Sequence, residues 1–447
     1  PSLPGEDWVR YVDLHYVAQS DSIRTNPKTV LYCPDVLDDV EALNLWTRIY
    51  DREQEKAWAQ LGIRDEAPPR VTISENHWKD FSFEHSYDET LAVGAEFGVD
   101  NMFIDPIWEH GEALRQTIND LVPPDRQQGT LLDKLERLNM CCTLDFEVAE
   151  ILGGEAGLKR LCDKAAAEGI QVISWMATHY HPHSMVLQDK ALGHGKGGVV
   201  ACKESGRHPD TGYPSACWTA NLNAPVYERI REQVLGVCER TGLSGFLWDS
   251  YSNLGWWQVD YSDGSMRPQW DRMAQLYADL ANKGLYIQPE AVVSFSNHSC
   301  CGLHGGNVYA GDLLGYSYNT VIGLHYDGRQ ITDDILKGDA PIDEFFRCYA
   351  HKRAVGIHFQ RVPREEWDAD AARAIKDTIA MYKAARPFMH RRTVLHDDRG
   401  VLWEGKDGER ILWTFREQPA EEAATDLLSG EAAADSGLAK YRVYRLG

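Results

Sequence analysis

The feature that most limits the possible folds of this chain is an alternation of short apolar runs and helical patterns that begins at Arg70. The apolar runs have the length of buried strands, and the stretches between them carry apolar residues at helical spacing. Strands that alternate with helices form parallel sheets, because each helix carries the chain back across the sheet. The expected strands are Val71–Ser74, Asn101–Ile104, Ile170–Met176, Phe246–Trp248, Leu285–Phe295, Asn307–Gly311, Thr320–His325 and Ala354–Gln360.

This alternation predicts an α/β fold, a (βα)8 barrel of the TIM type, which takes about 250 residues or more. The chain has 447 residues, so a barrel leaves room for smaller flanking pieces. One crossover is short, because Thr320 comes only eight positions after Asp312. Either the helix there is reduced, or the sixth and seventh strands are one element. The expected helices are Tyr87–Phe97, Gly157–Glu168, Pro225–Thr241, Ile342–His351 and Ala369–Ala385.

Changes in pattern divide the chain into three parts. Residues 1–69 are expected to form an N-terminal lead-in segment with one helical stretch, Asp39–Leu61, and residues 70–392 the barrel. From Thr393 onward the pattern becomes strand-like, so residues 393–447 are predicted to form a small C-terminal β domain. The stretches expected to be loops are Ser184–Thr219, over the mouth of the barrel, Ser296–Gly306 and Ala420–Ala434.

The charge of the chain excludes several kinds of partner. A formal net charge of −22 would repel nucleic acid and anionic membranes, whose phosphates are also negative. A neutral carbohydrate fits this composition, because 14 Trp and 20 Tyr supply flat rings that pack on sugars, although such rings also fill protein cores. No apolar run approaches the length of a membrane span. Homo-oligomerisation stays open.

The ten cysteines do not follow a disulfide or zinc pattern. Cys141–Cys142 and Cys300–Cys301 are adjacent pairs, and no CxxC spacing occurs. We therefore expect a reducing, cytoplasmic setting. Because the chain begins with Pro1 rather than Met, secretion through a trimmed signal also stays open.

Acidic residues occur where the expected strands end. In barrels of this kind the chemistry takes place at the carboxyl ends of the strands. Asp249 is the most informative of these acids, because it follows the apolar run Phe246–Trp248 and is followed by polar residues. This order indicates a carboxylate where a buried strand emerges. Asp249 could instead cap the next helix or solvate the rim of the barrel.

Several stretches carry a resemblance to a known group of enzymes. They are Glu75–Phe81 (ENHWKDF), Ala95–Asp105 with Trp108 behind it, Leu247–Asp249 (LWD), Tyr309–Asp312 (YAGD) and Met381–Arg386 (MYKAAR). In this order they resemble motifs of clan D glycoside hydrolases, nearest to family 36, the α-galactosidases and α-N-acetylgalactosaminidases. The resemblance covers Arg70–Gly447.

The resemblance implies a retaining, exo-acting α-glycosidase that uses no cofactor or metal. Asp249 matches the nucleophile of the family and Asp312 its general acid/base. Such a reaction needs one carboxylate to attack the anomeric carbon and one carboxyl group to protonate the leaving oxygen. Asp327 and Glu290 are the rival candidates for the acid. The expected substrate-binding residues are Glu75, Asp105, Trp108, Trp175, His179, Trp248, Tyr251 and Glu290.

The chain also departs from the family pattern. Leu247 stands where the family has a sugar-binding Lys, and Pro106 replaces the second Asp of a pair. Ala177-Thr178-His179 replaces the Glu-Pro-Glu expected after Trp175. Residues 1–69 are also too few for the family's N-terminal β-sandwich. These departures indicate a different α-linked sugar.

Three further readings compete with hydrolysis by two carboxylates. His179, His181 and His183 alternate like ligands of a metal-dependent barrel hydrolase, although Pro182 interrupts them. The barrel could also bind glycans without catalysis, or transfer the sugar to an acceptor other than water. For Trp248, which points away from Asp249 by strand alternation, and for the other tryptophans, core packing is the alternative to sugar stacking.

Overall fold

The computed structural model describes most of the barrel and the C-terminal region. The described residues are 70–74, 82–84, 86–109, 143–180, 184, 199–202, 218–248, 258–260, 270–289, 305–306, 321–322, 334–339, 341–351, 356–358, 362–433 and 437–447, with isolated positions between 38 and 62.

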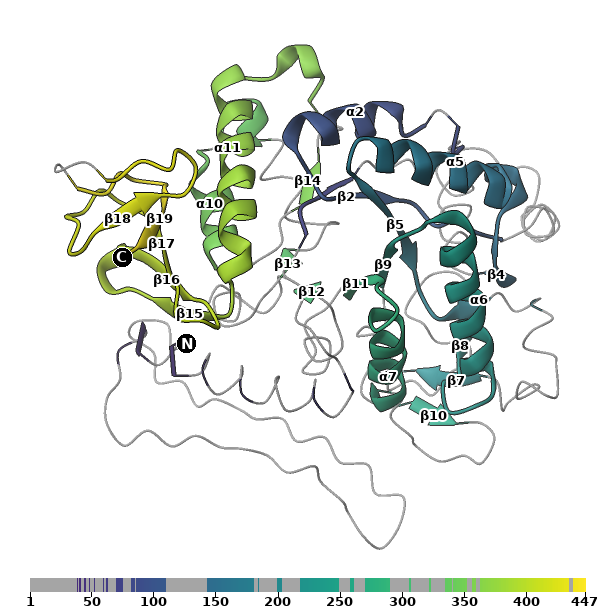
Figure 1. The fold of residues 1–447 in the computed structure, drawn as a ribbon. Helices are drawn as coiled ribbons and strands as arrows, with labels where there is room; N and C mark the ends of the chain where they lie inside the picture. The colour runs from purple at the N-terminus through teal and green to yellow at the C-terminus, as the bar shows by residue number, and fades with distance from the viewer. Residues whose placement is uncertain are drawn as a thin grey trace, which may run out of the picture.

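A six-stranded sheet in which every pair of neighbours is parallel forms the centre of the molecule (Figure 1). The order of its strands is β11-β9-β5-β2-β1-β14. A separate parallel pair joins β12 to β13. The strands are β1 (Thr72–Ser74), β2 (Asn101–Ile104), β5 (Gln171–Met176), β9 (Gly245–Trp248), β11 (Tyr286–Pro289), β12 (Gly305–Gly306), β13 (Val321–Ile322) and β14 (Gly356–His358).

Helices pack against one face of this sheet. On β1, the side chain of Ile73 packs against Gly94 of α2. A Cβ added to Gly94 would lie only 3.1 Å from Ile73 Cγ2. On β9, Trp248 packs against Tyr277 of α7, with ring centroids 5.1 Å apart. Several of these helices end at a glycine in the left-handed conformation, for example Gly242 after α6. The helices are α2 (Asp88–Phe97), α5 (Gly154–Ala167), α6 (Val226–Thr241), α7 (Trp270–Ala281), α10 (Asp343–Ala350) and α11 (Ala369–Ala385), with 3-10 turns at Glu150–Leu152, Arg364–Glu366, Arg386–Phe388 and His396–Asp398.

Short antiparallel strands lie between the barrel elements. An antiparallel pair of β3 (Trp108–Glu109) and β4 (Asp145–Val148) follows β2. A four-stranded sheet has the order β10-β7-β8-β6. The expectation of a loop over Ser184–Thr219 is wrong, because β7 and the start of β8 lie in that stretch and pair with each other, with β10 and with β6. The strands are β6 (His179–Tyr180), β7 (Val199–Cys202), β8 (Trp218–Ala220) and β10 (Gln258–Asp260).

The C-terminal region is a five-stranded antiparallel sheet with the order β15-β16-β17-β19-β18. The expectation of a loop over Ala420–Ala434 is wrong in part, because β18 lies within it and pairs with β19. The pairing offsets the weak strand propensity of alanine. The strands are β15 (Arg391–Val394), β16 (Gly400–Glu404), β17 (Arg410–Thr414), β18 (Ala424–Asp426) and β19 (Val443–Leu446).

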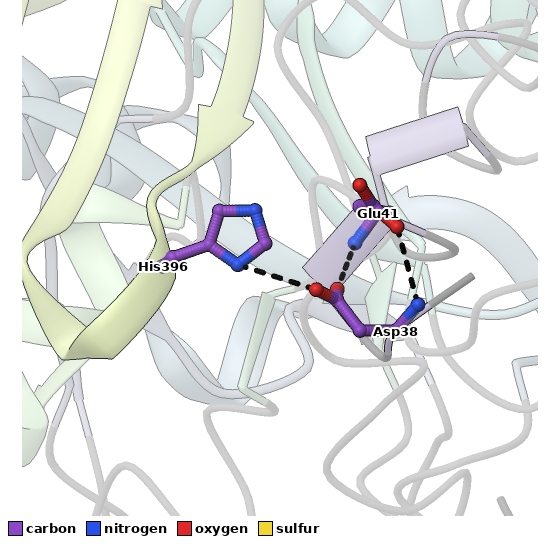
Figure 2. A group of neighbouring side chains, drawn as sticks. All are labelled: Asp38, Glu41 and His396. Carbon is purple, nitrogen blue, oxygen red and sulfur yellow. Dashed lines mark hydrogen bonds and ion pairs between the residues drawn. The ribbon is translucent and has the colours of Figure 1, made fainter. Parts of the chain in front are cut away.

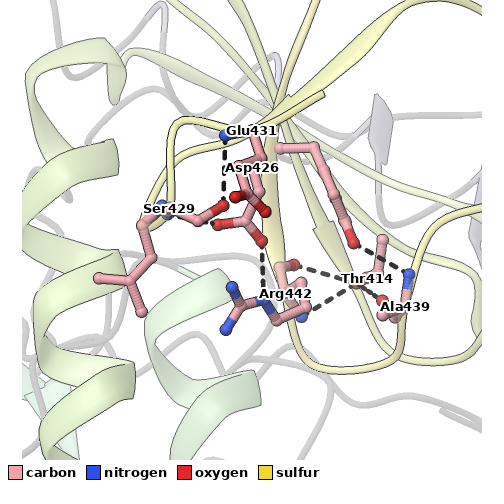
Figure 3. Close-up of polar contacts among 8 residues, drawn as sticks. Thr414, Asp426, Ser429, Glu431, Ala439 and Arg442 are labelled. Atoms are coloured by element: carbon pink, nitrogen blue, oxygen red, sulfur yellow. Dashed lines mark hydrogen bonds and ion pairs between the residues drawn. The ribbon is translucent and has the colours of Figure 1, made fainter. Parts of the chain in front are cut away.

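A polar cluster fixes the turns of this sheet (Figure 3). Asp426 accepts hydrogen bonds from the Ser429 N–H at 2.9 Å and from Arg442 Nε at 2.7 Å. The Thr414 hydroxyl lies 2.7 Å from the Ala439 carbonyl oxygen, to which it donates. These bonds tie β17, β18 and β19 together where the strands alone are short.

The C-terminal sheet is joined to the barrel through buried aromatic residues. Trp403 donates from Nε1 to the carbonyl of Ala350 at 2.7 Å, and its ring lies 4.9 Å from that of Trp413. Phe346 of α10 packs on Trp413 at 5.1 Å. Because both tryptophan side chains are fully buried, they stabilise the domain interface and present no ring to solvent.

None of the helices in the described part of the chain has the length and apolar character needed to cross a bilayer.

Candidate functional site

The carboxyl ends of the parallel strands lie at one edge of the sheet, which is where the site residues were expected. Five of the expected residues are described: Asp105, Trp108, Trp175, His179 and Trp248. The expected residues Glu75, Asp249, Tyr251, Glu290 and Asp312, and the rival acid Asp327, lie outside the described residues.

Asp105 is the residue immediately after β2, and its side chain is fully buried. Its backbone is held on both sides by hydroxyl groups. The Ser174 hydroxyl donates to its carbonyl oxygen at 3.0 Å, and its N–H donates to the Tyr87 hydroxyl oxygen at 3.4 Å. A carboxyl group thus occupies a fixed position at the end of a central strand, as the sequence led us to expect.

Trp175 lies on the inner side of the sheet. The register pairs Ile73 with Met102 and Met102 with Val172. These residues therefore face the helices, and alternation along β5 turns Trp175 inward. Trp175 is the register partner of Leu247, two residues before Asp249, and is 1% exposed. Its indole could line the floor of a site at this edge.

Trp248 and Trp108 have a different environment. Trp248 faces α7, where it packs on Tyr277, and is 1% exposed. Trp108 stacks on Phe246 with ring centroids 5.8 Å apart and meets Phe146 edge-on at 5.2 Å. This packing favours the core role for both tryptophans over stacking on a sugar, because their faces are already covered by aromatic side chains.

His179 belongs to the small antiparallel sheet rather than to the end of β5. It is the register partner of Thr219 in β8, and its carbonyl accepts a hydrogen bond from Thr143 N–H. Its neighbour Tyr180 packs edge-on against Phe146 at 5.2 Å. Burial, together with the nearby Asp145 carboxylate, raises the pKa of Tyr180 well above its usual range. The phenol therefore stays neutral, and the segment around His179 is held in a largely apolar packing layer.

Within the described residues, one group of three side chains could hold a metal ion: Asp38, Glu41 and His396 (Figure 2). All three are exposed, and they come from the N-terminal segment and the C-terminal sheet rather than from the strand ends. Asp38 and Glu41 each accept a hydrogen bond from the other's backbone N–H, at 2.8 and 3.2 Å. This reciprocal pairing is a helix capping box, which accounts for both carboxylates without an ion.

Two features of the site escaped the sequence-based prediction. Ser174 is a polar residue in an otherwise apolar run, and that contrast was the available signal. Gly245, at the start of β9, has φ 155°, and an added Cβ would lie only 1.8 Å from the carbonyl oxygen of Tyr286. The close pairing of β9 with β11 therefore requires glycine four residues before Asp249.

Comparison with known proteins identifies the fold. No protein-family model and no curated protein sequence matches this chain. Among solved structures, the chain is similar to the α-amylase of Geobacillus thermoleovorans, with a TM-score of 0.56 and 12% identity over 86% of this chain and 99% of the other. The α-amylase of Lactobacillus plantarum gives a TM-score of 0.56 and 12% identity over 84% and 98%. An Anoxybacillus α-amylase gives 0.54 and 12% over 84% and 97%.

The chain has a (βα)8 barrel fold. The expectation of a TIM-type barrel with a C-terminal β domain is thereby confirmed. The described residues include the six parallel strands of the main sheet and the separate parallel pair of β12 and β13. β12 lies in the stretch Ser296–Gly306, where a loop was expected, and the expected sixth strand Asn307–Gly311 lies outside the described residues. At this level of identity the likeness concerns the fold alone. The structures named above are α-amylases, so they lend no support to the family 36 specificity that the sequence motifs implied.

Proposed function

We propose that this chain is a retaining α-glycoside hydrolase whose reaction takes place at the carboxyl ends of the barrel strands. The observation that carries the proposal is the register of the parallel sheet. Trp248 and Pro289 are direct partners on neighbouring strands, and the sequence continues from them with Asp249 and Glu290. On the other side of β5, Asp105 is a buried acid that follows β2.

Such a group of acids at one edge of a barrel has the composition that glycoside hydrolysis needs. Asp249 would attack the anomeric carbon, and a protonated carboxyl group would release the leaving oxygen. The motif resemblance supports Asp312 as that acid. The register supports Glu290, because neighbouring strands are about 4.8 Å apart and retention requires carboxyl groups about 5 to 5.5 Å apart.

The substrate class follows from two kinds of support. The motifs favour an α-galactoside or α-N-acetylgalactosaminide, whereas the fold is shared with α-amylases, one of them in complex with acarbose. Both lines support an α-linked carbohydrate. Asp105, as a buried acceptor, would bind a sugar hydroxyl, and Trp175 would contribute an apolar surface beside it.

A mechanism-based inhibitor tests this proposal directly. The intact protein is first assayed on aryl α-glycosides of glucose, galactose and N-acetylgalactosamine and on maltooligosaccharides. A fluorinated analogue of the best substrate is then used to trap the covalent intermediate, and peptide mass spectrometry locates the sugar. We expect attachment at Asp249. Attachment at another residue would overturn that assignment, and absence of hydrolysis on the whole panel would overturn the function.

A further inference from the structure

Ser174 is out of place in the pattern of β5. After Gln171 the strand reads Val172, Ile173, Ser174, Trp175, Met176, so a single hydroxyl interrupts an apolar run. By register Ser174 lies beside Ile104 and Phe246, on the face that packs against the helices. A buried hydroxyl on such a face costs desolvation unless it is hydrogen-bonded. The hydroxyl has two carbonyl oxygens within reach, that of Asp105 at 3.0 Å and that of Trp175 at 3.3 Å, and the shorter contact is with Asp105.

The hydroxyl of Ser174 forms its hydrogen bond at the carboxyl end of β2. Ile104 and Ser174 are the last register pair between β2 and β5, and Asp105 is the next residue after that pair. The Ser174 hydroxyl donates to the Asp105 carbonyl oxygen at 3.0 Å, immediately beyond the last register pair. Ser174 is fully buried, so water cannot substitute for it.

The other side of Asp105 is held from a different element. The Asp105 N–H points to the hydroxyl of Tyr87, 3.4 Å away, and Tyr87 directly precedes α2. Tyr87 is fully buried. Bonds to both flanking peptide groups restrict φ and ψ of Asp105, and these two angles set the direction of its Cα–Cβ bond.

We propose that Ser174 and Tyr87 are positioning residues that direct the Asp105 carboxylate toward the substrate. The inference rests on the proposed glycosidase function and deepens it by naming the groups that fix its substrate-binding acid. Neither hydroxyl touches the substrate; both act through the backbone of Asp105. A preorganised acceptor of this kind matters because a displacement of about 1 Å can lower a rate about 100-fold.

A double-mutant cycle on the full chain tests the proposal. The variants are Ser174→Ala, Tyr87→Phe, Asp105→Asn and Ser174→Ala/Asp105→Asn, assayed for kcat and KM on the best substrate of the panel. We expect kcat/KM to fall about 100-fold in Asp105→Asn and about 10-fold in Ser174→Ala. Because the hydroxyl acts only through Asp105, the double variant should match Asp105→Asn within about 2-fold. A purely structural role would instead multiply the two losses.

A matched variant separates positioning from stability. The Thr378 hydroxyl of α11 is buried and donates to the Ala374 carbonyl at 2.8 Å, inside a helix. Thr378→Val should lower Tm about as much as Ser174→Ala while leaving kcat and KM unchanged. Tyr87→Phe removes one oxygen and keeps the ring, so it provides a second test if Ser174→Ala folds poorly.

The outcomes distinguish the two levels of inference. A wild-type protein that hydrolyses the panel while Ser174→Ala and Tyr87→Phe keep normal kcat/KM would overturn the positioning role alone. Multiplicative losses in the double variant would overturn it as well. A wild-type protein without activity on any α-glycoside overturns the proposed function, and the positioning role is lost with it.

Discussion

The two ends of the parallel sheet hold their acids in opposite ways. At the amino end, Asp100 before β2 accepts hydrogen bonds from Arg386 at 2.6 and 3.0 Å and from Val71 N–H at 2.9 Å. Lys383 lies 3.2 Å from the same carboxylate. At the carboxyl end, five residues further along the chain, Asp105 is held through its backbone by the neutral hydroxyls of Ser174 and Tyr87.

The difference between the two acids separates a contribution to stability from a contribution to function. At Asp100 the charge of the carboxylate is matched by two cations from the end of α11, Lys383 and Arg386. At Asp105 the hydrogen bonds of the Ser174 and Tyr87 hydroxyls hold the backbone of the residue. The amino end of a barrel usually contributes stability and the carboxyl end chemistry, and this chain follows that division.

The largest expected effect is at the carboxyl end. Asp249→Asn should lower kcat by about 1,000-fold or more, because it removes the proposed nucleophile while keeping the side-chain shape. Its Tm should change little. Steady-state kinetics and a thermal melt on the same preparation measure both. Normal turnover in this variant would contradict the proposal that the carboxyl end of the barrel carries out the reaction.

The next largest effect is a loss of stability at the start of β9. Gly245→Ala should destabilise the fold by about 3 kcal/mol or more, because the new Cβ would collide with the Tyr286 carbonyl oxygen 1.8 Å away. Gly169→Ala is the control: its φ is 73° with no atom within 4 Å of the added Cβ, so only backbone strain of about 1 kcal/mol is expected. Urea denaturation compares the two. Equal losses would show that the close β9–β11 approach is unimportant.

The ion pairs at the amino end should have an intermediate effect. Burial by itself would raise the pKa of Asp100, but the hydrogen bond and charge of Arg386, with Val71 N–H and Lys383, bring it below its usual value. The carboxylate side chain is 13% exposed, and Asp100→Asn should cost about 2 kcal/mol at neutral pH. Activity per folded molecule should stay unchanged, in contrast to Asp249→Asn.

The pKa of Asp100 also predicts how the stability of the wild type and of Asp100→Asn should change with pH. Because folding lowers the pKa of Asp100, the folded chain binds fewer protons than the unfolded chain at mildly acidic pH. The contribution of the pair is complete above the unfolded pKa of about 3.9 and is lost as the pH falls through the lower folded value. Asp100→Asn should therefore flatten the loss of stability in this acidic range, as measured by denaturation at several pH values. A variant with the same acid profile as the wild type would contradict the role of the pair.

The smallest effects lie away from both ends of the sheet, where the N-terminal segment meets β15. The Asn44 side chain donates to the Val394 carbonyl at 2.9 Å and accepts from its N–H at 2.8 Å, covering the outer edge of the C-terminal sheet. Asn44→Ala should cost about 1 kcal/mol. The nearby His396–Asp38 pair is more than half exposed, so His396→Gln should cost less than about 0.5 kcal/mol. A larger effect of His396→Gln than of Asn44→Ala would reverse this order.

The sequence predicted the regular elements best where apolar periodicity and caps agree. The expected helix Ala369–Ala385 has the observed bounds, and Asp368 caps it by accepting from Asp370 and Ala371 N–H. The strand Asn101–Ile104 also has the expected bounds. The small antiparallel strands were missed, because β7 and β8 lie in a Gly-rich stretch with few apolar residues and are stabilised by pairing with each other and with β6 and β10.

The candidate site was predictable in part. The position of Asp105 at a strand end and the core packing of Trp248 follow from strand alternation. The roles of Ser174 and Gly245 did not follow from it. The role of Ser174 depends on its hydrogen bond to the backbone of Asp105, which follows β2. The requirement for glycine at position 245 depends on how closely β11 approaches β9.

The sequence by itself determined the alternation of strands and helices, the face that each strand buries, and the acids that stand where strands end, because these depend on residues near one another in the chain. The tertiary structure alone decided that Asp100 pairs with cations and that the backbone of Asp105 is held by two hydroxyl groups. That choice depends on groups far away in sequence: Arg386 reaches Asp100 across 286 positions, and Ser174 reaches Asp105 across 69. Hydrogen bonds and ion pairs act over a few ångströms, so only the packing of the strands and helices could bring these partners together.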